Sequence, residues 1–242
     1  TFGHTALRIK DTENQLDVVY NYGAFDFRTE NFYLKFVKGD LQYFMNVTSF
    51  EDFIFEYQLD EREVIEQTLN LSLNKKQELF ETLNASLYST EKYYTYKFID
   101  RNCTTMVSDK INDLFDEKII QKVDDTSISY REVLYPYFED YFWYKLGINI
   151  IFGIKTDVKA EKLFLPIELL NSLDKAKIDG KPLVSEKKII VKGIEKPVSF
   201  SFFNSIFIII AFLLVIVLIN KRFLCLSDLF VCGILGVFLC LV

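Results

Sequence analysis

Histidine and cysteine are scarce in this chain. Its 242 residues include one histidine, His4, and four cysteines, of which only Cys103 lies outside an apolar run near the C-terminus. A zinc ion needs several His or Cys ligands close together, so we expect no metal site. A single thiol in the rest of the chain has no internal partner for a disulfide there. Cys103 is therefore either buried and inert or kept for its reactivity.

Clustered positive charge and glycine-rich loops are also lacking. The formal net charge is -6, and no stripe of Lys and Arg is available to neutralise nucleic-acid phosphates. The sequence contains no glycine-rich phosphate-binding loop. We therefore expect no nucleic-acid partner and no cofactor.

Apolar residues are abundant and unevenly placed. They make up half of the chain, with 24 Phe and 14 Tyr, which is enough to bury a full-sized core. Two apolar runs, residues 202–219 and 223–242, are each close to the ~20 residues that a helix needs to cross a bilayer. We expect two transmembrane helices there, with a buried helical hairpin as the alternative. The positive-inside rule then places the turn at Lys221-Arg222 in the cytoplasm and residues 1–200 outside it.

These expectations divide the chain into four parts. Residues 1–170 are predicted to form the catalytic domain and residues 171–201 a juxtamembrane linker, before the two membrane helices. The chain begins at Thr1 without an initiator methionine or the signal sequence that an exported domain needs. We therefore expect a fragment, with further helices beyond the second apolar run.

The hydrophobic pattern predicts an α+β fold. Residues 6–9 and 17–20 read as strands around a polar turn at 11–15, and alternation over 41–45 and 53–57 predicts two more strands. From residue 60 the spacing changes to three and four, which predicts helices over 64–71 and 79–87.

Cys103 is expected at the start of a helix. Val107, Ile111 and Leu114 follow it at helical spacing and predict one apolar face. The unpaired N–H groups and the positive dipole end of a helix N-terminus stabilise a thiolate, which would make this thiol nucleophilic. The competing interpretation is a small buried cysteine with a structural role.

His4 is the natural partner for such a thiol. A cysteine nucleophile needs a base or a cation beside it, and an imidazole is the usual group. A third polar residue normally orients the ring. The candidates on or after the second predicted strand are Asn21, Tyr22 and Asp26. Asn102 and Thr104, next to the cysteine, are candidates for supporting it or for binding the oxyanion of an intermediate.

Several motifs resemble one family. FGHTALRI at residues 2–9, YNYGAFDF at 20–27 and DRNCTT at 100–105 are similar to bacterial inner-membrane proteins with an extracytoplasmic, permuted papain-like (NlpC-like) domain. The resemblance extends to about residue 170 through Trp143, Gly147, Gly153, Asp157 and the FLP segment at 164–166. The order of His before Cys is the reverse of that in papain, as circular permutation implies.

The resemblance implies an activity. The family includes lipoprotein N-acyltransferases of the Lnb type, in which a periplasmic catalytic domain takes a fatty acyl chain from a membrane phospholipid. The chain is then passed to the α-amine of the N-terminal cysteine of a diacylated lipoprotein. By resemblance, Cys103 is the nucleophile that carries the acyl group as a thioester, and His4 is the base.

Two other functions remain open at this stage. A membrane-anchored cysteine peptidase or amidase acting on cell-wall peptides would share the nucleophile and the fold. A membrane-anchored binding module would keep His4 and Cys103 in structural roles.

Overall fold

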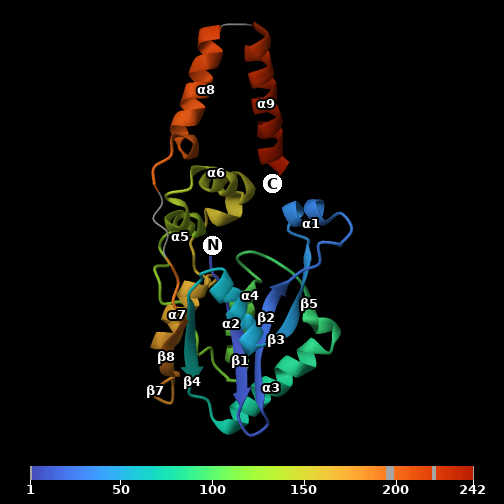
Figure 1. The fold of residues 1–242 in the computed structure, drawn as a ribbon, viewed down its shortest axis with the longest axis vertical. Helices are drawn as coiled ribbons and strands as arrows, with labels where there is room; N and C mark the ends of the chain where they lie inside the picture. Colours follow the sequence, from blue (N-terminus) through green and yellow to red (C-terminus); the bar gives the residue numbers. More distant parts are fainter. Residues whose placement is uncertain (1, 195–198, 220–221, 242) are drawn as a thin grey trace. The chain divides into compact units, whose positions relative to one another are not determined.

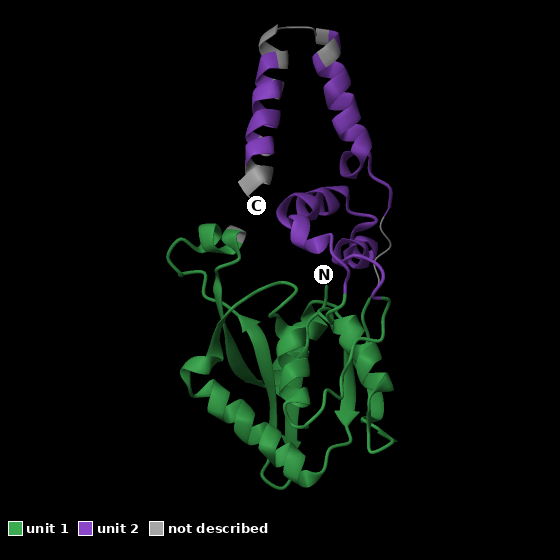
Figure 2. Ribbon diagram, turned by 180° about the vertical axis from the view of Figure 1, so that it is seen from behind, with its two compact units in different colours: residues 1–125, 161–195 green, residues 126–160, 196–242 purple. Residues whose placement is uncertain are grey.

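The computed structural model describes residues 2–194, 199–219 and 222–241, which form parts of two compact units (Figures 1 and 2). Unit 1 comprises residues 1–125 and 161–195, and unit 2 comprises residues 126–160 and 196–242. The predicted boundary at residue 170 is thus not a boundary between units. Much of the predicted linker belongs to unit 1. Residues 171–175 form the end of a helix there, and residues 184–191 form a strand that pairs with residues 64–69.

Unit 1 is built on a four-stranded antiparallel sheet in the order β1-β2-β3-β5. The strands are β1 (Ala6–Asp11), β2 (Leu16–Ala24), β3 (Gln42–Ser49) and β5 (Tyr93–Thr95). The predicted turn at residues 11–15 joins β1 to β2, so these two strands are confirmed. The short helix α1 (Phe32–Lys38) connects β2 to β3 at the end of the sheet where β1 begins (Figure 1).

Three helices of unit 1 contribute to the core beside this sheet. They are α3 (Leu73–Leu87), α4 (Cys103–Asn112) and α7 (Pro166–Lys175). Their buried side chains join those of the strands in one cluster, which includes Leu7, Tyr20, Met45, Leu83, Val107, Ile111 and Leu169. The helical face predicted below Cys103 is confirmed, because Val107, Ile111 and Leu114 are each at most 4% exposed.

The strand predicted over residues 53–57 is wrong, because helix α2 (Phe50–Leu59) occupies this segment. The Ser49 hydroxyl accepts a hydrogen bond from the Asp52 N–H at 3.0 Å, which caps the first turn. The acidic side chains of Glu51 and Asp52 also lie near the positive end of the helix dipole. These local signals outweigh the alternation of aromatic residues.

The helix predicted over residues 64–71 is also wrong. Strand β4 (Val64–Leu69) pairs antiparallel with β8 (Val184–Val191), a partner far along the chain. Helix α3 then begins at Leu73, with Ser72 as its N-cap. Arg8 on β1 ties the two sheets together, since its guanidinium donates to Asp17 on β2 and to Glu66 on β4.

Unit 2 contains α5 (Tyr130–Leu134), η2 (Tyr135–Phe138), α6 (Phe142–Ile151), η3 (Ile154–Thr156), η4 (Phe202–Asn204), α8 (Ile206–Ile219) and α9 (Arg222–Leu241). Arg131 organises the loop after α6. Its guanidinium donates to Asp157 Oδ1 at 2.6 Å, to Asn149 Oδ1 at 2.8 Å and to the Gly153 carbonyl at 3.1 Å. The downstream motif residues Gly153 and Asp157 therefore serve the structure of unit 2.

The prediction of two transmembrane helices is wrong for the described residues, in which no helix is both long and apolar enough to cross a membrane. The first apolar run is divided, because residues 202–204 form a 3-10 turn and α8 begins only at Ile206. Its 14 residues span ~21 Å, less than the ~30 Å of a hydrocarbon core. The second run forms α9, whose sequence includes Arg222 and Asp228. Asn220 and Lys221, in the turn predicted to be cytoplasmic, lie outside the described residues.

Candidate active site

Cys103 is the first residue of α4, and Asn102 is its N-cap. The Asn102 Oδ1 atom accepts hydrogen bonds from the N–H groups of Thr104 and Thr105 at 2.8 and 3.0 Å. The Thr105 hydroxyl accepts one from the Asn102 N–H at 2.9 Å, which completes a capping box. The local sequence thus starts a helix at the cysteine, as predicted.

The Asn102 amide also holds two other segments. Its Nδ2 atom donates to the carbonyl of Phe98 at 2.6 Å and to that of Phe164 at 2.9 Å. With both ends of the amide occupied, Asn102 is a support for the cysteine helix and not a donor to an oxyanion. Thr104 is a support as well, because it is fully buried and its hydroxyl lies 3.1 Å from that of Thr5.

A buried ion pair stabilises the segment that Asn102 contacts at Phe164. Glu168 Oε1 is 2.6 Å from Lys122 Nζ, and both side chains are only 3% exposed. Glu168 Oε2 accepts hydrogen bonds from the N–H groups of Phe164 and Leu165 at 2.9 and 3.0 Å. The pair therefore holds the segment at Phe164 and Leu165 in place, and the Phe164 carbonyl of this segment accepts the hydrogen bond from Asn102. Sequence reasoning misses both charged residues because their spacing carries no recognisable motif.

His4 is placed by the residues on either side of it. Gly3 has a φ of +87°, and a Cβ atom there would lie 3.2 Å from Cγ of Pro166. On the other side, the N–H of Thr5 hydrogen-bonds to the Cys103 sulfur. His4 therefore enters the site just before β1, while Cys103 enters it at the start of α4, and the two side chains hydrogen-bond to each other.

Asn21 is the residue that orients the histidine. Its Oδ1 atom lies 3.2 Å from His4 Nε2, and its Nδ2 atom is 3.4 Å from both the Val19 carbonyl and the Thr48 hydroxyl. The other ring nitrogen of His4, Nδ1, is therefore the one left to hydrogen-bond to the Cys103 sulfur. In this arrangement the asparagine can orient the imidazole, and the imidazole can act as a base toward the thiol.

The other two candidates for this position are elsewhere. Tyr22 points away from His4 into the core with 1% exposure, since neighbouring residues on a strand face opposite sides. Asp26 lies beyond the end of β2 and pairs with Arg28 at 2.8 Å. The structure therefore brings His4, Cys103 and Asn21 together and leaves Tyr22 and Asp26 out.

The acidities of the central pair are shifted toward the charged forms. Burial disfavours an imidazolium, but the hydrogen bond and negative charge of Cys103 outweigh it and raise the pKa of His4. Burial also disfavours a thiolate, yet His4 and the hydrogen bonds from Thr5 and Thr104 lower the pKa of Cys103. The raised pKa of His4 and the lowered pKa of Cys103 both favour a thiolate–imidazolium pair.

Three tyrosines beside the thiol are missing from the sequence-based candidates. They are Tyr57 on α2, Tyr94 on β5 and Tyr96 just after it. Burial and the negative charge of Cys103 raise the pKa of each. Tyr94 is 2% exposed, and its hydroxyl has no hydrogen-bond partner among the described residues. The site thus has an aromatic wall, with the Arg62 guanidinium 4.6 Å from the centre of the Tyr57 ring and that of Arg101 5.4 Å from the centre of the Tyr94 ring.

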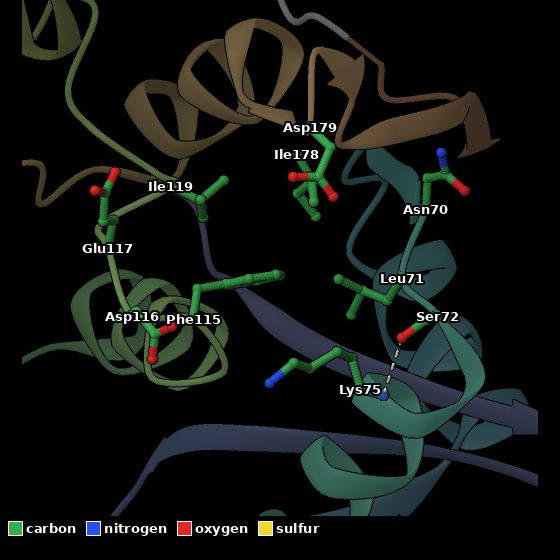
Figure 3. Close-up of a pocket in the computed structure, with 10 residues that line it drawn as sticks. All are labelled: Asn70, Leu71, Ser72, Lys75, Phe115, Asp116, Glu117, Ile119, Ile178 and Asp179. Carbon is green, nitrogen blue, oxygen red and sulfur yellow. Dashed lines mark hydrogen bonds between the residues drawn. The ribbon is translucent and has the colours of Figure 1, made fainter.

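A pocket of about 440 Å³ lies elsewhere in unit 1 (Figure 3). It is lined by Asn70, Leu71, Ser72, Lys75, Phe115, Asp116, Glu117, Ile119, Ile178 and Asp179. Most of these residues follow the C-terminal end of α4 or surround the start of α3, and Ile178 and Asp179 belong to the hairpin over residues 177–182. Because Cys103 is the first residue of α4, this pocket is at the wrong end of that helix to serve the thiol. In the described part of the chain, no group of three or more His, Cys, Asp or Glu side chains is placed to hold a metal ion.

Comparison with known proteins gives one family. Residues 1–135 match the model of the Lnb N-terminal periplasmic domain. This span includes His4, Asn21 and Cys103. Searches of curated proteins and of solved structures gave no match.

Proposed function

We propose a function from the premise that this chain belongs to the Lnb N-terminal periplasmic domain family, whose model matches more than half of it. The function is cysteine-dependent lipoprotein N-acylation at the periplasmic face of the bacterial inner membrane. A phospholipid is the acyl donor, and the α-amine of the N-terminal cysteine of a diacylated lipoprotein is the acceptor.

The main support for this proposal is the contact of Cys103 with His4, together with the hydrogen bond from the histidine ring to Asn21. A thiol beside an imidazole, with a lowered pKa, is suited to attack a carbonyl carbon. The position of this thiol at a helix N-terminus on an antiparallel sheet also supports a permuted papain-like fold for unit 1.

Acylation of the enzyme is the first step. The Cys103 thiolate attacks the ester carbonyl carbon of the phospholipid and forms a C–S bond. The N–H of Cys103 itself is the donor that we assign to the oxyanion, because Asn102 already caps the N–H groups of Thr104 and Thr105. The ester C–O bond then breaks, and His4 gives its proton to the leaving alkoxide. The products are an acyl-Cys103 thioester and a lysophospholipid.

Transfer is the second step. The lipoprotein amine attacks the thioester carbonyl, and neutral His4 accepts a proton from the amine nitrogen. The C–S bond breaks, the amide is complete, and the thiolate–imidazolium pair is restored. The tyrosine wall is a suitable neighbour for an acyl chain, because it presents apolar rings beside the sulfur.

Intact-mass spectrometry tests this function. Incubation with phospholipid should give an adduct of fatty-acyl mass that hydroxylamine removes and that Cys103→Ala does not form. A diacylated lipopeptide with a free N-terminal cysteine should discharge the adduct and yield a triacylated product, whereas its acetylated form should not, because an amide nitrogen is a poor nucleophile. Cleavage of cell-wall peptides without any lipid adduct would instead favour the peptidase.

A further inference from the structure

Helix α1 and the loop before it expose an unusual set of large apolar side chains. Phe27 is 72% exposed, Tyr33 79%, Leu34 55% and Phe36 56%. We call these four residues the α1 face. Three of them have rings close to that of the buried Phe32, at 5.0 Å for Phe27, 5.4 Å for Tyr33 and 6.3 Å for Phe36, centroid to centroid. Contiguous exposed apolar side chains of this kind mark interaction sites.

The charge of α1 restricts the partner. Within the helix the charged residues are Lys35 and Lys38, both near its C-terminal end, and no acidic residue is present. Aromatic and leucine side chains combined with lysines are typical of segments that lie in a membrane interface, where the cations meet anionic headgroups. The Arg28 guanidinium on the preceding loop is already paired with Asp26.

The α1 face is located at the same end of the sheet as the candidate active site. Ala6 at the start of β1 is opposite Asn21 near the end of β2, and α1 connects that end of β2 to the start of β3. A single residue, Thr5, separates His4 from the start of β1. The antiparallel register therefore brings the helix and the catalytic histidine to one edge of unit 1.

A continuous row of aromatic rings leads from the α1 face toward the thiol. Phe27 contacts Phe32 at 5.0 Å, Phe32 contacts Phe25 at 5.7 Å, and Phe25 contacts Tyr43 at 5.2 Å, measured between centroids. Tyr43 stacks on Tyr96 at 4.5 Å, and Tyr96 belongs to the tyrosine wall of the site. Phe32 and Tyr43 are buried, so this row connects the α1 face to the site by ring packing within the core.

We propose that the α1 face docks unit 1 on the surface of an anionic phospholipid bilayer, with the aromatic side chains among the upper acyl carbons and Lys35 and Lys38 at the headgroups. The purpose of this docking, delivery of an acyl donor to Cys103, rests on the proposed function, whereas the docking itself can be measured independently.

Single-tryptophan fluorescence of the full chain tests the docking. Trp143 is the only native tryptophan, so Tyr33→Trp is made in a Trp143→Phe background. Vesicles of phosphatidylglycerol and phosphatidylethanolamine with brominated acyl chains should quench this indole and shift its emission to the blue. A matched control with Glu13→Trp, in the turn at the opposite end of β1 and β2, should show neither effect even if another part of the chain binds vesicles.

Charge and aromatic variants define the contact. Lys35→Gln with Lys38→Gln should weaken partitioning into the anionic vesicles on the order of tenfold, with little change for phosphatidylcholine vesicles. Equal quenching at positions 33 and 13, or none at 33, would refute the docking. A shift at position 33 that depends on protein concentration and not on vesicles would also refute it, and would assign the face to a second copy.

The two proposals can fail separately. If Phe27→Ser with Phe36→Ser abolishes vesicle quenching but still forms the acyl-Cys103 adduct from detergent-dispersed phospholipid, the docking and the chemistry both stand. If the indole at position 33 is quenched while no adduct forms under any condition, the proposed function is wrong and the docking stands. If the adduct forms but vesicles never quench the indole at position 33, the docking is wrong and the proposed function stands.

Discussion

Replacement of Asn102 by alanine tests whether the cap of α4 holds the cysteine in place. The wild-type side chain accepts hydrogen bonds from the N–H groups of Thr104 and Thr105 and donates to the carbonyls of Phe98 and Phe164. Asn102 is 3% exposed, so solvent cannot replace these contacts readily. Asn102→Ala therefore removes a helix cap and also leaves two carbonyl groups without their donor.

The expected loss can be worked out from these contacts. Removal of an N-cap side chain costs about 1 kcal/mol. A buried polar group that loses its partner costs about 1–3 kcal/mol, and two carbonyls are affected. We therefore expect the free energy of unfolding to fall by about 3–7 kcal/mol, a large fraction of the 5–15 kcal/mol typical of a folded protein.

Two further variants separate the parts of this loss. Asn102→Asp keeps an acceptor for the cap but places a buried carboxylate against the carbonyls of Phe98 and Phe164, so it should lose stability although the cap is retained. Ser72→Ala removes the cap of α3, which is exposed, and should cost only about 1 kcal/mol.

Urea unfolding followed by far-ultraviolet circular dichroism measures these changes. The fluorescence of Trp143 reports on unit 2 and serves as an internal control in the same samples. Should Asn102→Ala lose no more stability than Ser72→Ala, the link between the cysteine helix and the Phe164 segment does not hold the site together, and our account of Asn102 is wrong.

Three other predictions concern the same site. Gly3→Ala should lower the melting temperature and the alkylation rate of Cys103, because a side chain at a φ of +87° is strained and would press on the ring of Pro166. The rate of Cys103 alkylation by iodoacetamide should titrate below the ordinary thiol pKa of 9.0, and His4→Gln should move this midpoint upward, since it removes the positive charge and the hydrogen bond that favour the thiolate. Lys122→Met should destabilise unit 1 by about 3–5 kcal/mol in urea, because it leaves the Glu168 carboxylate buried without its counter-ion.

Matched controls accompany these predictions. Gly147→Ala, in a helix with open space around it, should be neutral or slightly stabilising. Lys187→Met removes an exposed ion pair with Asp174 and should cost at most about 1 kcal/mol. A midpoint for Cys103 that is unchanged by His4→Gln would contradict the pairing of the two residues.

Local sequence was sufficient for several elements. The polar turn at residues 11–15 and the strands beside it need only their own alternation and turn residues, and both strands are found as predicted. The start of α4 at Cys103 follows from an asparagine cap and an apolar face of helical spacing, all within one short segment. The scarcity of histidine and cysteine then indicated the pair that the structure brings together.

Only the tertiary structure selected the partner of His4. Asn21, Tyr22 and Asp26 were equivalent in sequence, but pairing of β2 with β1 turns Asn21 toward the histidine and Tyr22 into the core. Asp26 lies past the end of the strand. The choice depends on the register between two strands, which is not encoded in the residue types of either strand alone.

The same reason explains why β4 was predicted wrongly and why two buried charged residues were missed. Strand β4 owes its conformation to β8, which lies far along the chain, and the Lys122–Glu168 pair joins two residues that are 46 positions apart in sequence. The apolar run at 202–219 has the composition of a membrane span, but its helix begins only at Ile206. Periodicity and composition describe what a segment can form by itself, whereas pairing, burial and helix length depend on contacts that exist only after the chain has folded.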